Sequence, residues 1–375
     1  MEITPLLARC CCLAVVLFIS AASAEMNASD HRTLSHDWDR FAAAQYLDAR
    51  QIWWMNWPKA QRDHDTACIS CHTAVPYALA RPSMRHSLGE SALSSPEQAM
   101  LGYITKRVNL WNEVEPFYSD QKIGPRKTVE SRGTEAVLNA LILARYDAQR
   151  GHLSEDARRA FDNMWATQLT GGDELGSWNW LNFHNAPWES NESHYYGSTL
   201  AALAVGLAPG NYKESPEIQP DMQKLASYLV RNYDSQPLAN RIVLLWASTR
   251  LPGLLSPQKR TTLLDDIRAQ QREDGGWSLT GLGEWKRKDN TPLDERSDGY
   301  ATGLAVYVLK EAGVSTKKLE MKRAIAWLVE NQDIKEGSWP AHSLNKQRDA
   351  ATDVGRFMSD AATSYSVMAL EAVHR

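Results

Sequence analysis

The feature that most constrains the fold is a repeated unit of two helices joined by a polar loop. In three copies, a helix that ends in Gln is followed by Gly-x-Trp and then by a second helix rich in small apolar residues. Apolar residues recur every three or four positions in both segments, and Gly, Pro and Asp gather between them. This pattern predicts helical hairpins and excludes strands. The three copies cover residues 161–206, 263–309 and 324–370.

Three further hairpins keep the helical periodicity without the complete Gln-loop-Trp signature. Two of them precede the first copy described above, and the third lies between the first and second copies. Their paired segments are residues 41–57 with 74–80, 96–118 with 133–145, and 221–231 with 237–249. A repeat of this length points to an architecture in which each unit buries its apolar face against its neighbours. We therefore expect an all-α fold of about six helical hairpins.

Around Gln271 to Trp277 and Gln332 to Trp339, the sequence resembles the QW repeats of the squalene-hopene cyclase and protein prenyltransferase superfamily. This resemblance spans roughly residues 130–375. It implies an α/α toroid, with inner and outer rings of helices around a central cavity. We expect the Gln side chains to satisfy backbone groups at helix ends and the Trp side chains to pack on the neighbouring hairpin.

The resemblance does not extend to the chemistry of that superfamily. The cyclases protonate their substrate with a D-x-D-D motif, and the string is absent from this chain. The prenyltransferase β subunits bind zinc through Asp, Cys and His, but beyond the N-terminal segment this chain has only Cys68 and Cys71. Fold alone does not fix function. Asp298 and Asp360 recur at the starts of second helices, where we expect them to act as N-terminal caps.

The stretch Cys68-Ile69-Ser70-Cys71-His72 has the spacing of a haem-attachment site and resembles the c-type cytochromes. Two thiols at this spacing add to the haem vinyl groups, and the imidazole that follows becomes the proximal iron ligand. The alternatives are a redox disulfide and half a zinc site, whose usual sequence contexts are not visible here. The sequence thus predicts one covalent haem c in the first inter-helix loop, held by Cys68, Cys71 and His72.

The sixth ligand of such a haem is not fixed by the sequence. Met84 and His86 follow the motif closely, but a helix beginning at Ala74 carries them toward the opposite end of the toroid. The remaining candidates lie in loops expected on the haem face. They are His64, His184, His194, His342 and Met358.

Residues 1–24 have the features of a secretory signal peptide. A short segment ending at Arg9 precedes an apolar run from Cys10 to Ser20, and Ala22-Ser23-Ala24 fits the small-x-small cleavage rule. We expect cleavage before Glu25 and a periplasmic or secreted protein. The remainder divides into an N-terminal haem-bearing helical region, 25–129, and a toroid region, 130–375. Its apolar runs are too short to span a membrane.

The charge and the loop lengths limit what the chain binds and where. A formal charge of −4 gives no electrostatic footprint for nucleic acid. Four loops within hairpins are long, and in an α/α toroid all of these loops emerge at the same end. Long loops commonly carry function. The four loops are residues 58–72, 169–193, 272–298 and 333–359.

Three functions are compatible with these features. The first is electron transfer by an exported mono-haem c-type cytochrome with a redox partner protein, and we rank it first because it needs only the haem. The second is a haem-dependent oxidoreductase acting on an apolar or carbohydrate-like ligand in the toroid cavity. The third is a non-redox toroid enzyme, a polysaccharide lyase or hydrolase, with a structural haem. The sequence does not decide whether the protein is an enzyme.

The longest Trp-rich loop supplies the residues that an enzyme of this shape would use. For acid and base chemistry the first candidates are Glu189, Glu192, His194 and Tyr195. We expect this loop to line the mouth of the toroid cavity. The lining residues would be Trp178, Trp180, His184, Trp188, His194 and Tyr195.

Overall fold

The computed structural model describes residues 37–120 and 126–374, so the predicted signal peptide at 1–24 lies outside the described residues. The described chain forms twelve α-helices and a two-stranded antiparallel ribbon, β1 (Gln61–Arg62) with β2 (Thr66–Ala67). The helices are α1 (Arg40–Asn56), α2 (Ala74–Ser87), α3 (Ser95–Asn109), α4 (Arg126–Asp147), α5 (Glu155–Ala166), α6 (Ser193–Leu207), α7 (Gln219–Asn232), α8 (Leu238–Arg250), α9 (Pro257–Ala269), α10 (Gly299–Glu311), α11 (Leu319–Glu330) and α12 (Phe357–Val373).

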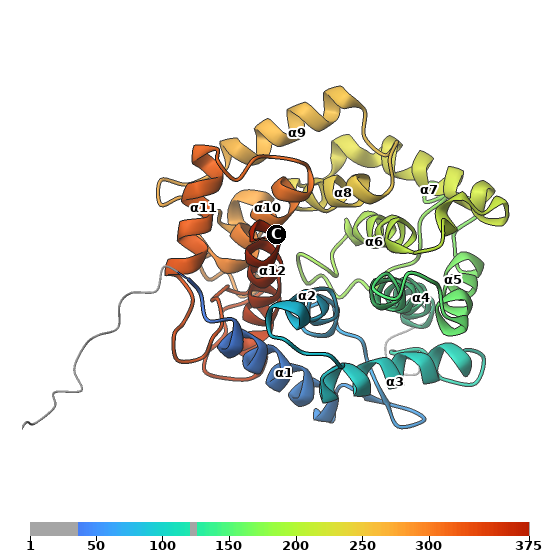
Figure 1. The fold of residues 1–375 in the computed structure, drawn as a ribbon. Helices are drawn as coiled ribbons and strands as arrows, with labels where there is room; N and C mark the ends of the chain where they lie inside the picture. Colours follow the sequence, from blue (N-terminus) through green and yellow to red (C-terminus); the bar gives the residue numbers. More distant parts are fainter. Residues whose placement is uncertain (1–36, 121–125, 375) are drawn as a thin grey trace, which may run out of the picture. The chain divides into compact units, whose positions relative to one another are not determined.

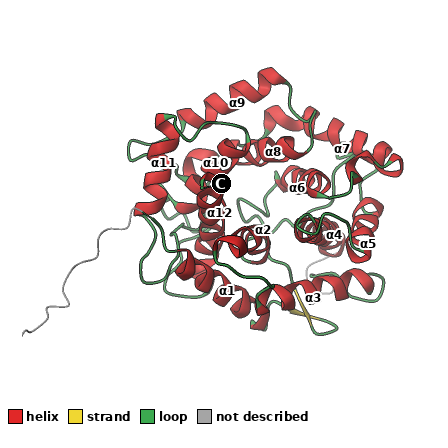
Figure 2. Ribbon diagram, in the orientation of Figure 1, coloured by secondary structure: helices red, strands yellow, loops and turns green. Residues whose placement is uncertain are grey.

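The helices of the described chain close into a ring (Figure 1). The outer helices α5, α7, α9 and α11 pack most on the inner helix that precedes them in the chain. The even-numbered helices pack on one another in the order α2, α4, α6, α8, α10 and α12, and α12 returns to α2. The odd-numbered helices form an outer ring around them, and loops connect the two rings (Figure 2). The prediction of an all-α toroid is confirmed.

The two rings follow from two kinds of helix sequence. In α6 twelve of fifteen residues are buried, because the helix is apolar or small on every side. In the outer helix α9, Leu263 and Ile267 are the buried residues, and the other faces are polar. A helix that is apolar all round belongs in the interior, whereas one with a narrow apolar stripe covers a surface. No helix among the described residues is long and apolar enough to cross a membrane.

Three Gln side chains tie successive outer helices together. Each Nε2 donates one hydrogen bond to a Gly carbonyl in its own loop and another to a carbonyl at the start of the next outer helix. We call each such arrangement, with its Trp, a Gln–Trp clasp. The bonds run from Gln168 to Gly176 and Asp221 (3.1 and 3.0 Å), from Gln271 to Gly275 and Glu320 (2.7 and 2.8 Å), and from Gln332 to Gly337 and Asp39 (3.0 and 2.9 Å).

The Trp of each clasp is fully buried and binds its own hairpin. Its indole Nε1 donates to a carbonyl in the last turn of the preceding outer helix. The three bonds, all 2.7 Å long, run from Trp178 to Met164, from Trp277 to Ile267 and from Trp339 to Leu328. The Trp side chains were expected to pack on the neighbouring hairpin, and the ring of Trp339 does contact Trp38, just before α1, with ring centroids 5.9 Å apart. A buried indole N–H needs an acceptor, and last-turn carbonyls lack helical partners.

The glycine of each clasp lets two backbones touch. Gly337 has a φ of +75°, and a Cβ added there would lie 2.3 Å from the backbone carbonyl carbon of Ala42 on α1. Gly176 repeats this arrangement against Lys224 on α7. Only glycine meets both requirements, since a side chain is strained at positive φ and has no space here.

The two aspartates predicted as caps differ. Asp298 is the N-cap of α10, and its carboxylate accepts from the backbone N of Ala301 at 2.8 Å, so that prediction is confirmed. Asp360 lies within the first turn of α12 and caps no backbone group. It instead accepts hydrogen bonds from the side chains of Arg50, Tyr46 and Thr73. The sequence could not show these partners, because all three lie in the first hairpin.

The Gln332 clasp closes the ring, since it joins the last hairpin to the backbone of Asp39 before α1. We expect Gln332→Ala to lower the free energy of unfolding by about 1–3 kcal/mol, because it leaves buried backbone groups without partners. Denaturant unfolding measures this change. Gln45→Ala, on the exposed face of α1, is the matched control and should leave the midpoint unchanged. Equal midpoints for the two variants would contradict the role of the clasp.

Candidate functional site

Three adjoining cavities lie where the loops within hairpins emerge, which is the end predicted as the working face. The outer cavity has a volume of 520 Å³, the aromatic cavity 240 Å³ and the arginine cavity 670 Å³. Asn345 lines both the outer and the aromatic cavity. Ser343, Arg348 and Gly355 line both the aromatic and the arginine cavity. The aromatic cavity therefore adjoins both of the others.

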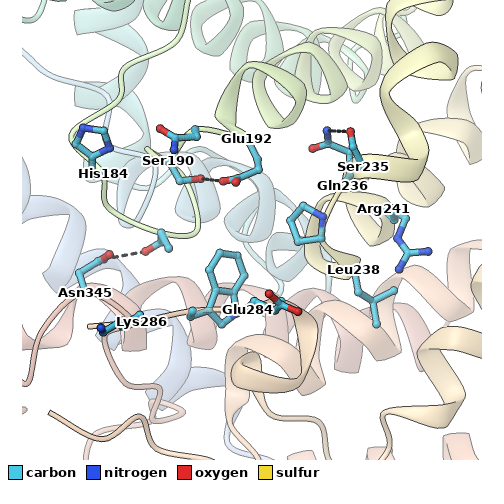
Figure 3. Close-up of a pocket in the computed structure, with 15 residues that line it drawn as sticks. His184, Ser190, Glu192, Ser235, Gln236, Leu238, Arg241, Glu284, Lys286 and Asn345 are labelled. Carbon is cyan, nitrogen blue, oxygen red and sulfur yellow. Dashed lines mark hydrogen bonds between the residues drawn. The ribbon is translucent and has the colours of Figure 1, made fainter. Parts of the chain in front are cut away.

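The outer cavity carries two carboxylates from different loops. Glu192 comes from the loop that leads into α6, and Glu284 comes from the loop that leads into α10. Figure 3 shows them on facing sides of the cavity, and Ser190 Oγ donates to Glu192 Oε2 at 2.8 Å. The indole of Trp285 and the charged side chain of Arg241 complete this part of the wall. The cavity is thus polar, open and acidic on two sides.

Hydrogen bonds between loops fix the position of this wall. Asn345 Nδ2 donates to the carbonyl oxygen of Ala186 at 2.8 Å (Figure 3). Lys288 Nζ donates to the carbonyl oxygen of Phe183 at 3.0 Å and to Asn185 Oδ1 at 2.9 Å. Three loops from three different hairpins are therefore bound to one another beside the two carboxylates.

The aromatic cavity contains the Cys-x-x-Cys-His motif. Cys71 and His72 line it, together with a half-buried carboxyl group, Glu189. Burial raises the pKa of Glu189 to about 7. A hydrogen bond from Asn185 and the positive charges of Lys127 and Lys288 lower this pKa, but by less than burial raises it. The aromatic residues of the lining are Trp54, Trp57, Tyr118, Phe183, Trp188 and Phe357.

The motif loop is held in place by its own backbone and by Trp54. Cys68 N donates to the carbonyl oxygen of Ala60 at 2.7 Å, and Trp54 Nε1 donates to the carbonyl oxygen of Cys68 at 2.6 Å. Ser70 Oγ accepts from the backbone N of Thr73 and of Ala74. The motif thus forms the N-terminal entry to α2, in the first inter-helix loop as predicted.

Both thiols of the motif are buried and free of disulfide bonds. Burial raises the pKa of Cys68 to about 12 and raises the pKa of Cys71 as well. A reactive dithiol depends on the thiolate, which a low pKa provides. The environment therefore disfavours the redox-disulfide alternative.

A buried relay fixes the orientation of His72. His72 Nδ1 lies 2.8 Å from Thr73 Oγ1, and that hydroxyl donates to Asp360 Oδ2 at 2.6 Å. Arg50 binds the same carboxylate through Nε at 2.7 Å. Because the Thr73 hydrogen is directed to Asp360, the Thr73 oxygen accepts from His72 Nδ1–H. The neutral tautomer with a lone pair on Nε2 follows. Burial lowers the pKa of His72 to about 3, which also keeps the ring neutral.

Of the candidates for a sixth haem ligand, Met358 alone shares a described cavity with His72. His184 lines the outer cavity, and His342 lines the arginine cavity next to Asp294. His194 lies near Glu174, and His64 lies beside Asp63. Met84 and His86 are in the last turn of α2, away from the motif, as expected.

Only some of the residues predicted to line the mouth of the toroid cavity line a cavity in the structure. His184 and Trp188 line the outer and aromatic cavities respectively. Trp178 and Trp180 are fully buried beneath the loop. His194 and Tyr195 line none of the three cavities, and the Tyr195 hydroxyl donates to a backbone carbonyl. Sequence reasoning missed Glu284, because an exposed Glu in a polar loop carries no distinguishing pattern.

Comparison with known proteins gives structural neighbours only. No family model matches the chain, and no curated protein matches it. A wild-type glycosidase matches with a TM-score of 0.53 and 13% identity, covering 92% of this chain and 99% of its own. A variant glycosidase matches with a TM-score of 0.51 and 12% identity, and the match covers 92% of this chain and 98% of the glycosidase chain. At these identities the likeness shows the fold.

The prediction of an electron-transfer cytochrome is wrong. The fold that extends over nearly the whole chain is shared with glycosidases. The comparisons give no support to a redox partner protein. Among residues 37–120 and 126–374, no group of three or more His, Cys, Asp or Glu side chains is placed to hold a metal ion. Attachment of a haem at Cys68 and Cys71 is a separate matter that these findings do not test, and it stays a prediction.

The raised pKa of Glu189 predicts a pH-dependent stability. Between the ordinary Glu value of about 4.3 and the folded value of about 7, the folded chain holds a proton that the unfolded chain has lost. The free energy of unfolding should therefore fall as pH rises from about 4.5 to 7. Glu189→Gln should flatten this dependence by about 2 kcal/mol.

Denaturant titrations at several pH values measure the effect. Glu113→Gln, at an exposed position after α3, is the control and should keep the slope of the parent protein. An unchanged slope in Glu189→Gln would show that this carboxyl group does not titrate as described.

Proposed function

We propose that this chain is an exported hydrolase of carbohydrate polymers, and that the outer cavity is its active site. The observation that carries the proposal is the pair Glu192 and Glu284, which face one 520 Å³ cavity from two different loops. Hydrolysis of a glycosidic bond uses two carboxyl groups that flank the bond. One protonates the leaving oxygen, and the other activates water or forms the glycosyl intermediate.

The rest of the cavity suits a sugar ligand. Trp285 offers an apolar face, and Arg241, Gln236 and Asn345 offer hydrogen-bonding groups around it. Sugar rings have an apolar face and a polar rim, so a cavity with one indole and several polar groups matches their surface. The fold shared with glycosidases supports this assignment.

The long loops explain why the site is open at this end of the toroid. The α5–α6 and α9–α10 loops each supply one carboxylate, and the α11–α12 loop supplies Asn345 between them. A polymer can lie across an open depression, whereas a closed cavity admits only small ligands. This geometry favours a polysaccharide or an oligosaccharide as the substrate.

The purified protein should release reducing ends from at least one member of a panel of neutral and acidic polysaccharides. Glu192→Gln and Glu284→Gln should each lower kcat by roughly 10²–10⁴-fold, because general acid–base catalysis contributes about that much. Glu113→Gln, at an exposed position outside the lining of the cavity, should keep the parent rate. Thermal unfolding of each variant checks that the fold is intact.

Aryl glycosides with good leaving groups assign the two roles. The variant that lacks the acid should recover most of its activity on such substrates, since little protonation is needed, whereas the other variant should not recover. Two results would overturn the proposal. One is a parent protein that cleaves no polysaccharide of the panel, and the other is the formation of unsaturated sugar products, which belong to a lyase.

A further inference from the structure

The arginine cavity is the largest of the three, at 670 Å³, and the hydrolase proposal gives it no role. It shares its walls with the outer cavity, because the α9–α10 and α11–α12 loops line both. Lys286 lines the outer cavity, and the next residue in the chain, Arg287, lines the arginine cavity. Consecutive Cα atoms lie about 3.8 Å apart, so the two cavities approach each other closely at this point of the loop.

Hydrogen bonds between the two loops hold this boundary in place. Arg287 Nε donates to the carbonyl oxygen of Ser343 at 2.9 Å, and Lys288 N donates to the carbonyl oxygen of Asn345 at 2.8 Å. Figure 3 shows Asn345 and Lys286 on the same side of the outer cavity. A ligand that lies across this boundary therefore meets both cavities.

Arg287 is a buried cation without an acidic partner. The residue is 7% exposed, and its guanidinium donates to the carbonyl oxygens of Ser343 and Pro292. Its Nη1 also lies 3.5 Å from the hydroxyl of Thr291. Among the described residues, no carboxylate lies within ion-pair distance of it, and its Nη2 has no acceptor. Buried charges are normally paired, so an anionic group in this cavity would supply the charge that the chain does not.

A second arginine, from the other loop, lines the same cavity. Arg348 is exposed, and in the described part of the chain its guanidinium has neither a hydrogen-bond acceptor nor an ion-pair partner. A guanidinium presents paired N–H donors whose geometry matches the oxygens of a carboxylate or a sulfate. The cavity therefore holds two sets of such donors that the chain itself does not pair with an acid.

The acidic residues of the lining do not take up these donors. Asp294 is ion-paired with Arg296 at 2.6 Å, and His342 Nε2 lies 3.2 Å from the same carboxylate. Hydrogen bonding from Arg296 lowers the pKa of Asp294 to about 2, so this carboxylate is ionised and already paired. Glu295 is exposed, where water and salt screen its charge. Positive charge thus stays available at Arg287 and Arg348.

We propose that the arginine cavity is a subsite for the anionic group of an acidic polysaccharide, a carboxylate or a sulfate ester, which binds to Arg287 and Arg348. This inference rests on the hydrolase assignment and names the substrate class of that site. The polymer lies across the boundary at Lys286, with the bond to be cleaved in the outer cavity and a charged sugar in the arginine cavity. A volume of 670 Å³ is within the usual range of ligand sites. The chain has a formal charge of −4, so the attraction comes from these two arginines and not from the net charge.

The test is calorimetric binding of oligosaccharides to the full chain carrying Glu284→Gln, so that the ligand is not consumed. The probes are hexasaccharides of pectate, alginate and hyaluronan, each with its carboxyl-reduced neutral counterpart, and of a sulfated galactan with its desulfated counterpart. At least one acidic probe should bind about tenfold more tightly than its neutral counterpart, because hydrogen bonds between charged groups provide about that difference. Adding Arg348→Gln should remove this difference and leave the affinity for the neutral counterpart unchanged.

Lys346→Gln is the matched control, because it removes the same charge from an exposed position of the same loop and lines none of the three cavities. This variant should keep the preference for the acidic probe, and thermal unfolding checks that both variants are folded. The pair of probes that shows the difference, carboxylated or sulfated, identifies the anion.

Two results would overturn the subsite. One is equal affinity for every acidic probe and its neutral counterpart, and the other is an equal loss of affinity in Lys346→Gln and Arg348→Gln. Binding is measured without cleavage, so the two proposals fail separately. A parent protein that binds acidic probes but cleaves no polysaccharide contradicts the hydrolase assignment, whereas one that cleaves polysaccharides without this preference contradicts the subsite alone.

Discussion

The structure depends on the contacts that three Gln–Trp clasps make between a loop and the next outer helix. A hairpin of two helices cannot bury the apolar surface of its inner helix by itself, so it needs neighbours on both sides. The clasp supplies the join with backbone atoms, because the Gln amide and the Gly carbonyl meet the first turn of the following outer helix. Backbone-directed bonds do not depend on the neighbour's side chains, which explains how the three repeats that carry a clasp can follow one geometry although the neighbouring helices differ in sequence.

The clasp that closes the ring also places the residues that orient His72. Gln332 binds Asp39, and so the last loop reaches the first helix. The same closure brings α12 against α1 and α2, where Asp360 meets Arg50 and Thr73. The residues that orient His72 therefore lie 287 to 310 positions apart in the chain and depend on a completed ring. A chain without α12 would leave the Thr73 hydroxyl, the partner of that imidazole, without Asp360.

Much of the fold could be predicted from the sequence, because it rests on local periodicity. The six hairpins follow from apolar spacing, and the long loops at one end follow from counting residues between helices. The role of Asp360 could not be predicted in this way, since its partners come from the opposite end of the chain. The acid–base candidates show the same limit. Glu189 and Glu192 lie in an unusual Trp-rich loop and could be selected as candidates from the sequence. Glu284 became a candidate only because the structure places it opposite Glu192 in the outer cavity.

The Cys-x-x-Cys-His motif was the easiest feature to recognise, and the wrong prediction of electron transfer was based on it. Cys68, Cys71 and His72 say what kind of group a loop can bind, and five residues among 375 do not say what the remaining chain does. The toroid around them offers a 520 Å³ cavity with carboxylates that the motif does not touch. Asn345 lies between that cavity and the motif's own, bound to the Ala186 carbonyl. Because Ala186 and Glu192 lie in the same loop, this hydrogen bond joins the wall of the outer cavity to that of the aromatic cavity.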